Sequence, residues 1–414
     1  MRVFKRITAI ILIAVLAVLL PISALAQTIT ASFGNLSGTR VTATFDYDDS
    51  LFSGKDTKLK PKLAIASVTL AASAHNESYI KNALNNMGFE DITSFNYNSG
   101  AFSADDNDYA SYVLAGKDIV VGKRAYRLYV IAISGTQGYQ WVSNFNMGSS
   151  NEHRGFSIAA DRLMQSVSDY VKTDAKDSIF WIFGHSRGAA VGNIVGARLT
   201  AGNLGCKVFC YTSATPSTTR KKNLYGKGSL NNLFAINNPG DFITRIPLAS
   251  WNYRVYGRSV NLSNKGKVFS RMKTGFAQFL GEAYAGQTPG TVQRMIAECR
   301  KYSPTLKHYT NAITFTNKQG THNPYAYFSS LALVLSYGSE QRIGLQQMLN
   351  EIGNSQYAVN LTAMLVGLKL PCDRATLGNY LLSMDWRNLL AGMKGTAHAH
   401  SPEAYIAWVN ALYG

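Results

Sequence analysis

The chain has 414 residues, a formal net charge of +17 and four cysteines. This length allows one large domain with an insertion, or two domains. So few cysteines exclude a small scaffold built on disulfides, and no pattern typical of an RNA- or DNA-binding module accompanies the positive charge. We therefore expect no nucleic-acid partner, and the charge favours anionic surroundings such as cell-wall polymer or anionic lipid.

Residues 1–26 have the pattern of a secretory signal peptide. Three basic residues precede an apolar run from Ile7 to Leu20, and Ala24-Leu25-Ala26 supplies the small residues of a cleavage site. The run is shorter than the roughly 20 residues that a membrane-spanning helix needs. We therefore expect a secreted protein, extracellular or periplasmic, after removal of this signal.

The next part of the chain predicts one strand and two helices. Apolar and polar residues alternate from Val41 to Tyr47, which is typical of an edge strand or an extended lead-in. From Lys62 to Met87 the apolar spacing is helical, with a break near His75, and Gly88 stands where a helix end requires it. We interpret His75 as a turn residue.

Two further strands are predicted at Asp118–Val121 and Arg127–Ile133. The second runs into Ser134-Gly135-Thr136, a polar loop ahead of the strand discussed next. In an α/β-hydrolase arrangement, a donor to the oxyanion comes from such a loop. Thr136 can offer both a backbone N–H and a hydroxyl there, and an ordinary polar loop is the alternative.

The pattern Gly184-His185-Ser186-Arg187-Gly188 follows an apolar run of strand length, after an amphipathic helix at Phe156–Val171. A serine on a sharp turn from strand to helix needs glycine two residues before and after it, because larger side chains would collide with the turn. Ser186 is therefore the candidate nucleophile, and the N–H of Arg187 is a candidate oxyanion donor at the helix start. The alternative is an ordinary glycine-rich turn.

Strands are also predicted at Val208–Tyr211 and Asn232–Ile236. Strands that alternate with helices imply a mostly parallel sheet with helices on both faces, the α/β class. Asp241 comes just after the second of these strands, at the edge where such sheets place their chemistry. It is the candidate acid that orients a histidine, and a turn residue or helix cap is the alternative.

Residues 258–395 read as a mainly helical cap or lid, inserted into a core formed by 27–257 and 396–414. Six basic residues and no acidic one lie in the segment from Arg254 to Lys273. We expect this segment either to face an anionic lipid or wall polymer, or to be an ordinary solvated surface. Cys206 and Cys210 are predicted to lie in one strand, where a rise of about 3.3 Å per residue holds them too far apart to form a disulfide with each other. A disulfide between Cys299 and Cys372 is an open alternative.

The tail carries the candidate base. Ser401 and Pro402 predict the cap and first residue of a final helix. His400 therefore lies in a loop at a helix start, as expected for a base after the last strand. His398, two residues before it, is the alternative.

These motifs together resemble the class 3 lipase family of α/β-hydrolases, in a secreted form of bacterial type. The resemblance extends over roughly residues 64–257 and the tail. It includes Ser134-Gly135-Thr136 and two further stretches, Trp141 to Asn144 and His153-Arg154-Gly155-Phe156. It implies Ser186 as nucleophile, Asp241 as acid and His400 as base, with oxyanion donors from Thr136 and Arg187. Leucine usually follows the nucleophile in that family, so Arg187 is expected to place a cation beside the acyl site.

We therefore expect a secreted serine hydrolase that cleaves carboxylic esters of the lipase or esterase type through an acyl-enzyme. No metal or other cofactor is expected, because zinc-ligand spacings are absent from the sequence. Two alternatives stay open: a non-catalytic secreted protein with a hydrolase fold that binds anionic wall or lipid surfaces, and a serine peptidase or amidase. The sequence identifies neither the substrate-binding residues nor an oligomeric state.

Overall fold

The computed structural model describes residues 26–97, 108–137, 140–144, 150–202, 205–221, 230–297, 316–317, 320–321 and 394–414. The predicted signal peptide, except for Ala26, lies outside the described residues. Most of the predicted cap also lies outside them, together with Cys299 and Cys372.

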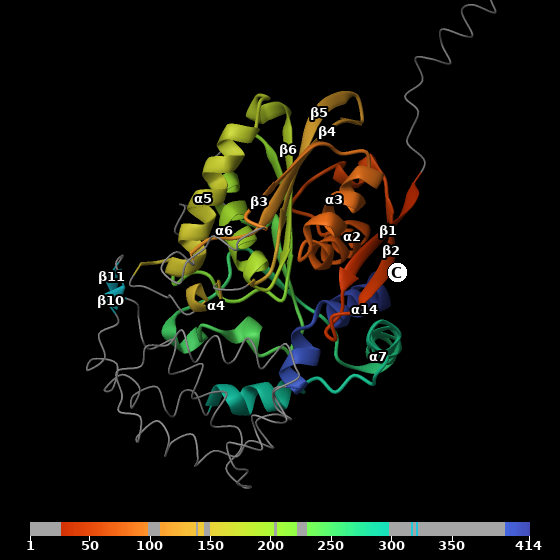
Figure 1. The fold of residues 1–414 in the computed structure, drawn as a ribbon, viewed down its shortest axis with the longest axis vertical. Coiled ribbons are helices and arrows are strands. Elements are labelled where there is room, and N and C mark those ends of the chain that lie inside the picture. The colour runs from red at the N-terminus through yellow and green to blue at the C-terminus, as the bar shows by residue number, and fades with distance from the viewer. Residues whose placement is uncertain are drawn as a thin grey trace, which may run out of the picture.

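A seven-stranded sheet forms the centre of the molecule, in the order β3-β4-β5-β6-β7-β8-β9 (Figure 1). Strand β4 is antiparallel to both of its neighbours, β3 and β5, and β5 to β9 are parallel. Their bounds are β3 Glu90–Phe95, β4 Tyr112–Val121, β5 Arg124–Ile133, β6 Ser178–His185, β7 Lys207–Ser213, β8 Leu233–Asn237 and β9 Arg258–Asn261. The predicted strands are confirmed, and β4 is longer than predicted because it pairs with β5 as a hairpin over its whole length.

Helices cover both faces of this sheet (Figure 1). The covering helices are α2 Pro61–Ser73, α3 Glu77–Asn86, α5 Arg154–Tyr170, α6 Arg187–Ala201 and α14 Pro402–Tyr413. Strand β6 shows why both layers form: Trp181 and Phe183 belong to the buried cluster that includes α2 and α14, whereas Phe180 and Ile182 belong to the cluster that includes α5 and α6. Every residue of β6 is buried, as expected for a central parallel strand. The predicted α/β-hydrolase class is confirmed.

The predicted edge strand is present, but in a separate two-stranded sheet. Strand β1 (Gln27–Gly34) pairs antiparallel with β2 (Arg40–Tyr47). Alternate residues of both strands, among them Ile29, Phe33 and Phe45, are buried in the cluster that includes α2 and α3. This ribbon therefore covers the helices on one side of the central sheet.

The predicted boundary between core and cap at residue 257 is corrected by the structure. Residues 258–261 form β9, the last strand of the central sheet, paired with β8. Helix α7 (Gly266–Leu280) packs against α14, and its Met272 and Phe276 are buried in the same cluster as Trp408. The core therefore continues to at least residue 280, because α7 covers apolar surface that α14 would otherwise expose.

Cys206 and Cys210 are both free, so they do not bridge each other, as the spacing predicted. The remaining short elements are α4 Gln140–Ser143, β10 Thr316–Asn317 and β11 Gly320–Thr321. Within the described ranges, no helix combines the length and the apolar character needed to cross a membrane.

Candidate active site

The turn between β6 and α6 holds Ser186 in a strained conformation, with φ 56° and ψ −121°. A Cβ atom at Gly184 would lie 2.5 Å from the carbonyl of Gly188, and one at Gly188 would lie 2.4 Å from the carbonyl oxygen of Ile133. Both glycines are therefore required by close backbone contacts, which is the reason the sequence pattern suggested. Ser186 itself is half-buried.

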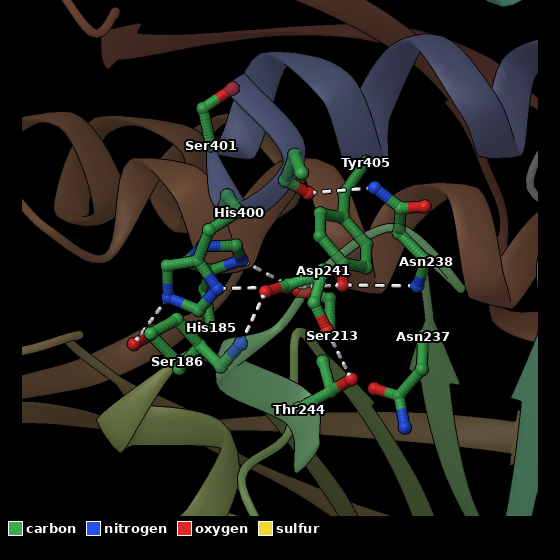
Figure 2. A network of polar contacts seen from close by, with 12 residues as sticks. His185, Ser186, Ser213, Asn237, Asn238, Asp241, Thr244, His400, Ser401 and Tyr405 are labelled. Atoms are coloured by element: carbon green, nitrogen blue, oxygen red, sulfur yellow. Dashed lines mark hydrogen bonds and ion pairs between the residues drawn. The ribbon is translucent and has the colours of Figure 1, made fainter. Parts of the chain in front are cut away.

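Three side chains from distant parts of the chain meet at this turn (Figure 2). His400 Nε2 lies 2.8 Å from Ser186 Oγ, and His400 Nδ1 lies 2.8 Å from Asp241 Oδ2. An ionised carboxylate can only accept hydrogen bonds, so the Nδ1–H group donates to Asp241. Nε2 is then left with the lone pair that faces the serine hydroxyl.

The carboxylate of Asp241 is fully buried and is held by two further donors. The backbone N–H of Ile243 donates to Oδ1 at 2.9 Å, and the hydroxyl of Tyr405 donates to Oδ2 at 2.7 Å. The N–H of Asn238 in turn donates to the Tyr405 oxygen at 3.0 Å (Figure 2). Burial, and then the charge of Asp241, raise the pKa of Tyr405 well above its ordinary value, so this hydroxyl stays a donor. Sequence reasoning did not identify Tyr405.

The backbone of His400 is fixed by a contact with another histidine, His185. Residues 394–400 are helical, where a loop was predicted, and Ser401 then caps α14 through the N–H of Ala404. His185 Nε2 contacts the carbonyl oxygen of His400 at 2.8 Å, and its Nδ1 contacts Ser213 Oγ at 3.1 Å. The histidine before the nucleophile therefore fixes the backbone that carries the candidate base.

His398, the alternative base, has other partners for both ring nitrogens. Its Nε2 lies 2.9 Å from Glu282 Oε1, and its Nδ1 accepts the N–H of Ala285 at 3.1 Å. Its side chain is 1% exposed. His398 therefore ties the segment after α7 to the tail, and His400 is the histidine that contacts Ser186.

The two candidate oxyanion donors border the same turn. Arg187 is the first residue of α6, and the first N–H groups of a helix have no acceptor within it. Thr136 is half-buried in the loop after β5, and its hydroxyl oxygen accepts a hydrogen bond from Asn144 Nδ2 at 3.0 Å. Asn144 lay in a stretch that carried the family resemblance, but its side chain was not singled out.

The side chain of Arg187 corrects one expectation. Its guanidinium is 1% exposed and donates to the carbonyl oxygen of Tyr109 at 2.8 Å and 3.2 Å, and to Asn144 Oδ1 at 2.9 Å. It also lies over the ring of Phe156. Burial lowers the pKa of Arg187 to about 10, so it stays charged at neutral pH. The cation is therefore held inside the protein by acceptor groups instead of lining the acyl site.

His75, interpreted as a turn residue, packs against the loop after β5 that contains Gly135 and Thr136. A Cβ atom on Gly135 would lie 2.2 Å from His75 Cε1, and the His75 and His185 rings are 6.1 Å apart. Burial, and then His400, lower the pKa of His75 to about 4. A hollow of about 510 Å³ adjoins it and is lined by His75, Asn76, Glu77, Ser78, Lys81, Tyr97 and Gln137. No sequence pattern indicated this contact, because it depends on the packing of two distant loops.

Comparison with known proteins gives one family and several solved structures. Residues 130–251 match the family model of class 3 lipases. No curated protein matches the chain. A triacylglycerol lipase structure described as having a serine protease triad is 14% identical, with a TM-score of 0.38, over 50% of this chain and 82% of its own.

Two fungal enzymes have similar sequence identities, TM-scores and coverage. The triacylglyceride lipase of Rhizomucor miehei is 16% identical, with a TM-score of 0.36, over 48% of this chain and 78% of its own. The mono- and diacylglycerol lipase of Aspergillus oryzae is 18% identical, with a TM-score of 0.34, over 50% of this chain and 81% of its own.

The matched segment contains Thr136, Ser186, Arg187 and Asp241, and the tail supplies His400. This match supports a lipase-type ester hydrolase. Residues 130–251 thus carry the class 3 lipase family signature that the sequence motifs predicted.

Proposed function

We propose that this protein is a secreted serine hydrolase of carboxylic esters, with Ser186 as nucleophile, His400 as base and Asp241 as the acid that orients His400. The observation that carries the proposal is the pair of contacts that His400 makes, 2.8 Å to Ser186 Oγ and 2.8 Å to Asp241 Oδ2. The class 3 lipase match over residues 130–251 supports an ester as substrate. Secretion rests on the signal-peptide pattern of residues 1–26.

In the first half of the reaction, His400 Nε2 takes the proton of Ser186 as Oγ attacks the carbonyl carbon of the ester. The carbonyl oxygen becomes an oxyanion, which accepts hydrogen bonds from the N–H of Arg187 and from Thr136. The ester C–O bond then breaks, and the alcohol leaves with the proton from His400. An acyl group remains on Ser186.

In the second half, water gives a proton to His400 Nε2 and attacks the acyl carbon. The carboxylic acid leaves as Ser186 regains its proton from His400. Asp241 keeps Nδ1–H toward itself and stabilises the imidazolium in both halves. The protein supplies the orientation of Asp241 through the N–H of Ile243 and the hydroxyl of Tyr405.

The proposal is tested by steady-state hydrolysis of p-nitrophenyl acetate and butyrate by the purified protein. Turnover is expected for the wild type and for Ser270→Ala, an exposed serine on α7, and not for Ser186→Ala. Hydrolysis by Ser186→Ala at the wild-type rate would overturn the assignment. No turnover of any ester by the wild type would favour the non-catalytic alternative, and a preference for the matching anilides would favour an amidase.

We also propose that α7 presents a basic surface to an anionic lipid or wall polymer. Lys265, Lys267, Arg271 and Lys273 are all exposed, and α7 contains no acidic residue. Such binding weakens as salt rises, because the charges are screened. Vesicles containing phosphatidylglycerol should bind the protein at low salt, and Lys267→Glu with Lys273→Glu should abolish that binding without changing ester hydrolysis. Equal binding of the protein to neutral vesicles would contradict a role for the basic surface of α7.

A further inference from the structure

A chain of hydrogen bonds joins the guanidinium of Arg187 to the hydroxyl of Thr136. Arg187 Nη1 donates to Asn144 Oδ1 at 2.9 Å, and Asn144 Nδ2 donates to Thr136 Oγ1 at 3.0 Å. Both outer residues belong to the candidate oxyanion site, Thr136 by its loop and Arg187 by its backbone N–H. Asn144 therefore connects the two sides of that site.

The direction of this chain is set by Arg187. A guanidinium has only donors, so the oxygen of the Asn144 carboxamide must point toward it. The NH₂ group of Asn144 then points toward Thr136 and uses one lone pair of the hydroxyl oxygen. Thr136 consequently keeps its own proton free for another acceptor. With the carboxamide reversed, the hydroxyl would donate to Asn144 and would be lost as a donor.

Both members that set the direction are rigidly held. The guanidinium also donates to the carbonyl oxygens of Tyr109 and Gly155, the latter at 3.4 Å. Asn144 is fixed through its backbone: its N–H donates to the carbonyl oxygen of Gln140, and its carbonyl oxygen contacts His153 Nε2 at 3.1 Å. The carboxamide therefore cannot turn over without breaking a charged hydrogen bond in a partly buried site.

We propose that Arg187 is a positioning residue for the oxyanion site, acting through Asn144 so that the Thr136 hydroxyl donates to the oxyanion. Arg187 then serves the reaction twice, by its backbone N–H directly and by its side chain at a distance. This inference rests on the proposed function, since it presupposes an ester reaction at Ser186. It goes beyond it by assigning a task to a buried cation and to a carboxamide that touches no reacting atom.

The decisive variant is Asn144→Asp. An aspartate keeps the shape of the side chain and gives Arg187 a counter-charge, so folding should be preserved. A carboxylate accepts hydrogen bonds and donates none, so Thr136 would donate its proton to the new carboxylate and withdraw it from the oxyanion. We expect kcat to fall about 100-fold with KM changed less than about 3-fold, since loss of one oxyanion donor costs about 100-fold or more.

The variant Thr136→Val separates loss of the hydroxyl donor from repulsion between the new carboxylate at position 144 and the oxyanion. Valine has the shape of threonine without the hydroxyl, and Thr136→Val alone should lower kcat about 100-fold. If Asn144→Asp acts through the hydroxyl, adding it to Thr136→Val should lower kcat no further. Asn252→Asp, at an exposed position with φ 67°, adds the same charge elsewhere and should keep the wild-type kcat.

The inference would be overturned if Asn144→Asp kept the kcat of the wild type, or if the effects of the two substitutions on kcat multiplied in the double variant. A fall in the urea midpoint of Asn144→Asp would also count against it, because a purely structural role for Asn144 predicts that loss. Failure of the proposed function itself looks different, since the wild type would then hydrolyse no ester. A wild type that turns over, with only Asn144→Asp behaving unexpectedly, isolates the fault in this inference.

Discussion

The hydroxyl of Tyr405 donates a 2.7 Å hydrogen bond to Oδ2 of Asp241, the same oxygen that His400 Nδ1 contacts at 2.8 Å. The buried carboxylate is therefore held by α14, which begins two residues after His400. Helix α14 thus supplies the group that fixes the acid, and it begins directly after the segment that carries the candidate base. This arrangement makes Tyr405 part of the support of the site.

Tyr405→Phe should lower kcat about 3- to 10-fold with little change in KM, because Asp241 loses one donor and holds His400 less firmly. It should also lower the free energy of unfolding by about 1–3 kcal/mol, since the N–H of Asn238 loses its acceptor in a buried place. Ester kinetics and urea unfolding measure the two effects. Tyr126→Phe, on a half-buried tyrosine of β5, is the matched control. If both variants had the same kcat and the same free energy of unfolding, Tyr405 would not support Asp241.

Substitutions of His400 and His398 should have different effects, the first on kcat and the second on stability. His400→Ala should lose kcat by about 1,000-fold or more, because no base would remain to take the serine proton. His398→Gln should keep kcat within about 3-fold and lose about 1–3 kcal/mol of stability, because His398 holds Glu282 and the N–H of Ala285. Ester kinetics with urea unfolding of both variants checks this. The reverse pattern would assign the base to His398.

Stability should fall in mild acid because buried histidines stay neutral in the folded protein. Burial, and then Arg187, lower the pKa of His153 from 6.5 to about 3, and burial with His400 and His75 lowers that of His185 well below its ordinary value. Between pH 6.5 and about 3 the unfolded chain binds protons at His153 that the folded chain does not. The free energy of unfolding should therefore be highest above this window and fall as pH is lowered, by up to about 1.4 kcal/mol per pH unit for each such histidine.

Urea midpoints measured from about pH 7 down to about pH 4 would test this slope. His153→Gln should make the slope shallower, since glutamine does not titrate and can still donate to the Asn144 carbonyl oxygen. Midpoints that stay constant over the same range would show that these histidines are protonated in the folded state.

The sequence predicted the parts of the site that depend on local patterns. An apolar strand, two glycines and a small-residue helix determine the turn at Ser186, and the cap at Ser401 with Pro402 places His400 before the last helix. These features arise from neighbours along the chain, so their spacing is visible in one dimension. Asp241 was found for the same reason, as the first acidic residue after a predicted strand.

The sequence could not predict where long side chains go once distant segments meet. Arg187 was expected beside the acyl site, but its guanidinium turns inward because the carbonyl groups of Tyr109 and Gly155 converge there. Its direction depends on loops remote from the serine turn. The core boundary was also placed too early, because β9 is short and polar and only its pairing with β8 identifies it as a strand.

The most direct test of Ser186 as a nucleophile activated by His400 is covalent labelling with a fluorophosphonate, followed by peptide mass spectrometry. We expect one phosphonyl group per chain on the peptide that contains Ser186, added fast in the wild type, much more slowly in His400→Ala and not at all in Ser186→Ala. Labelling at another residue, or labelling of Ser186 at the same rate in His400→Ala and wild type, would contradict it.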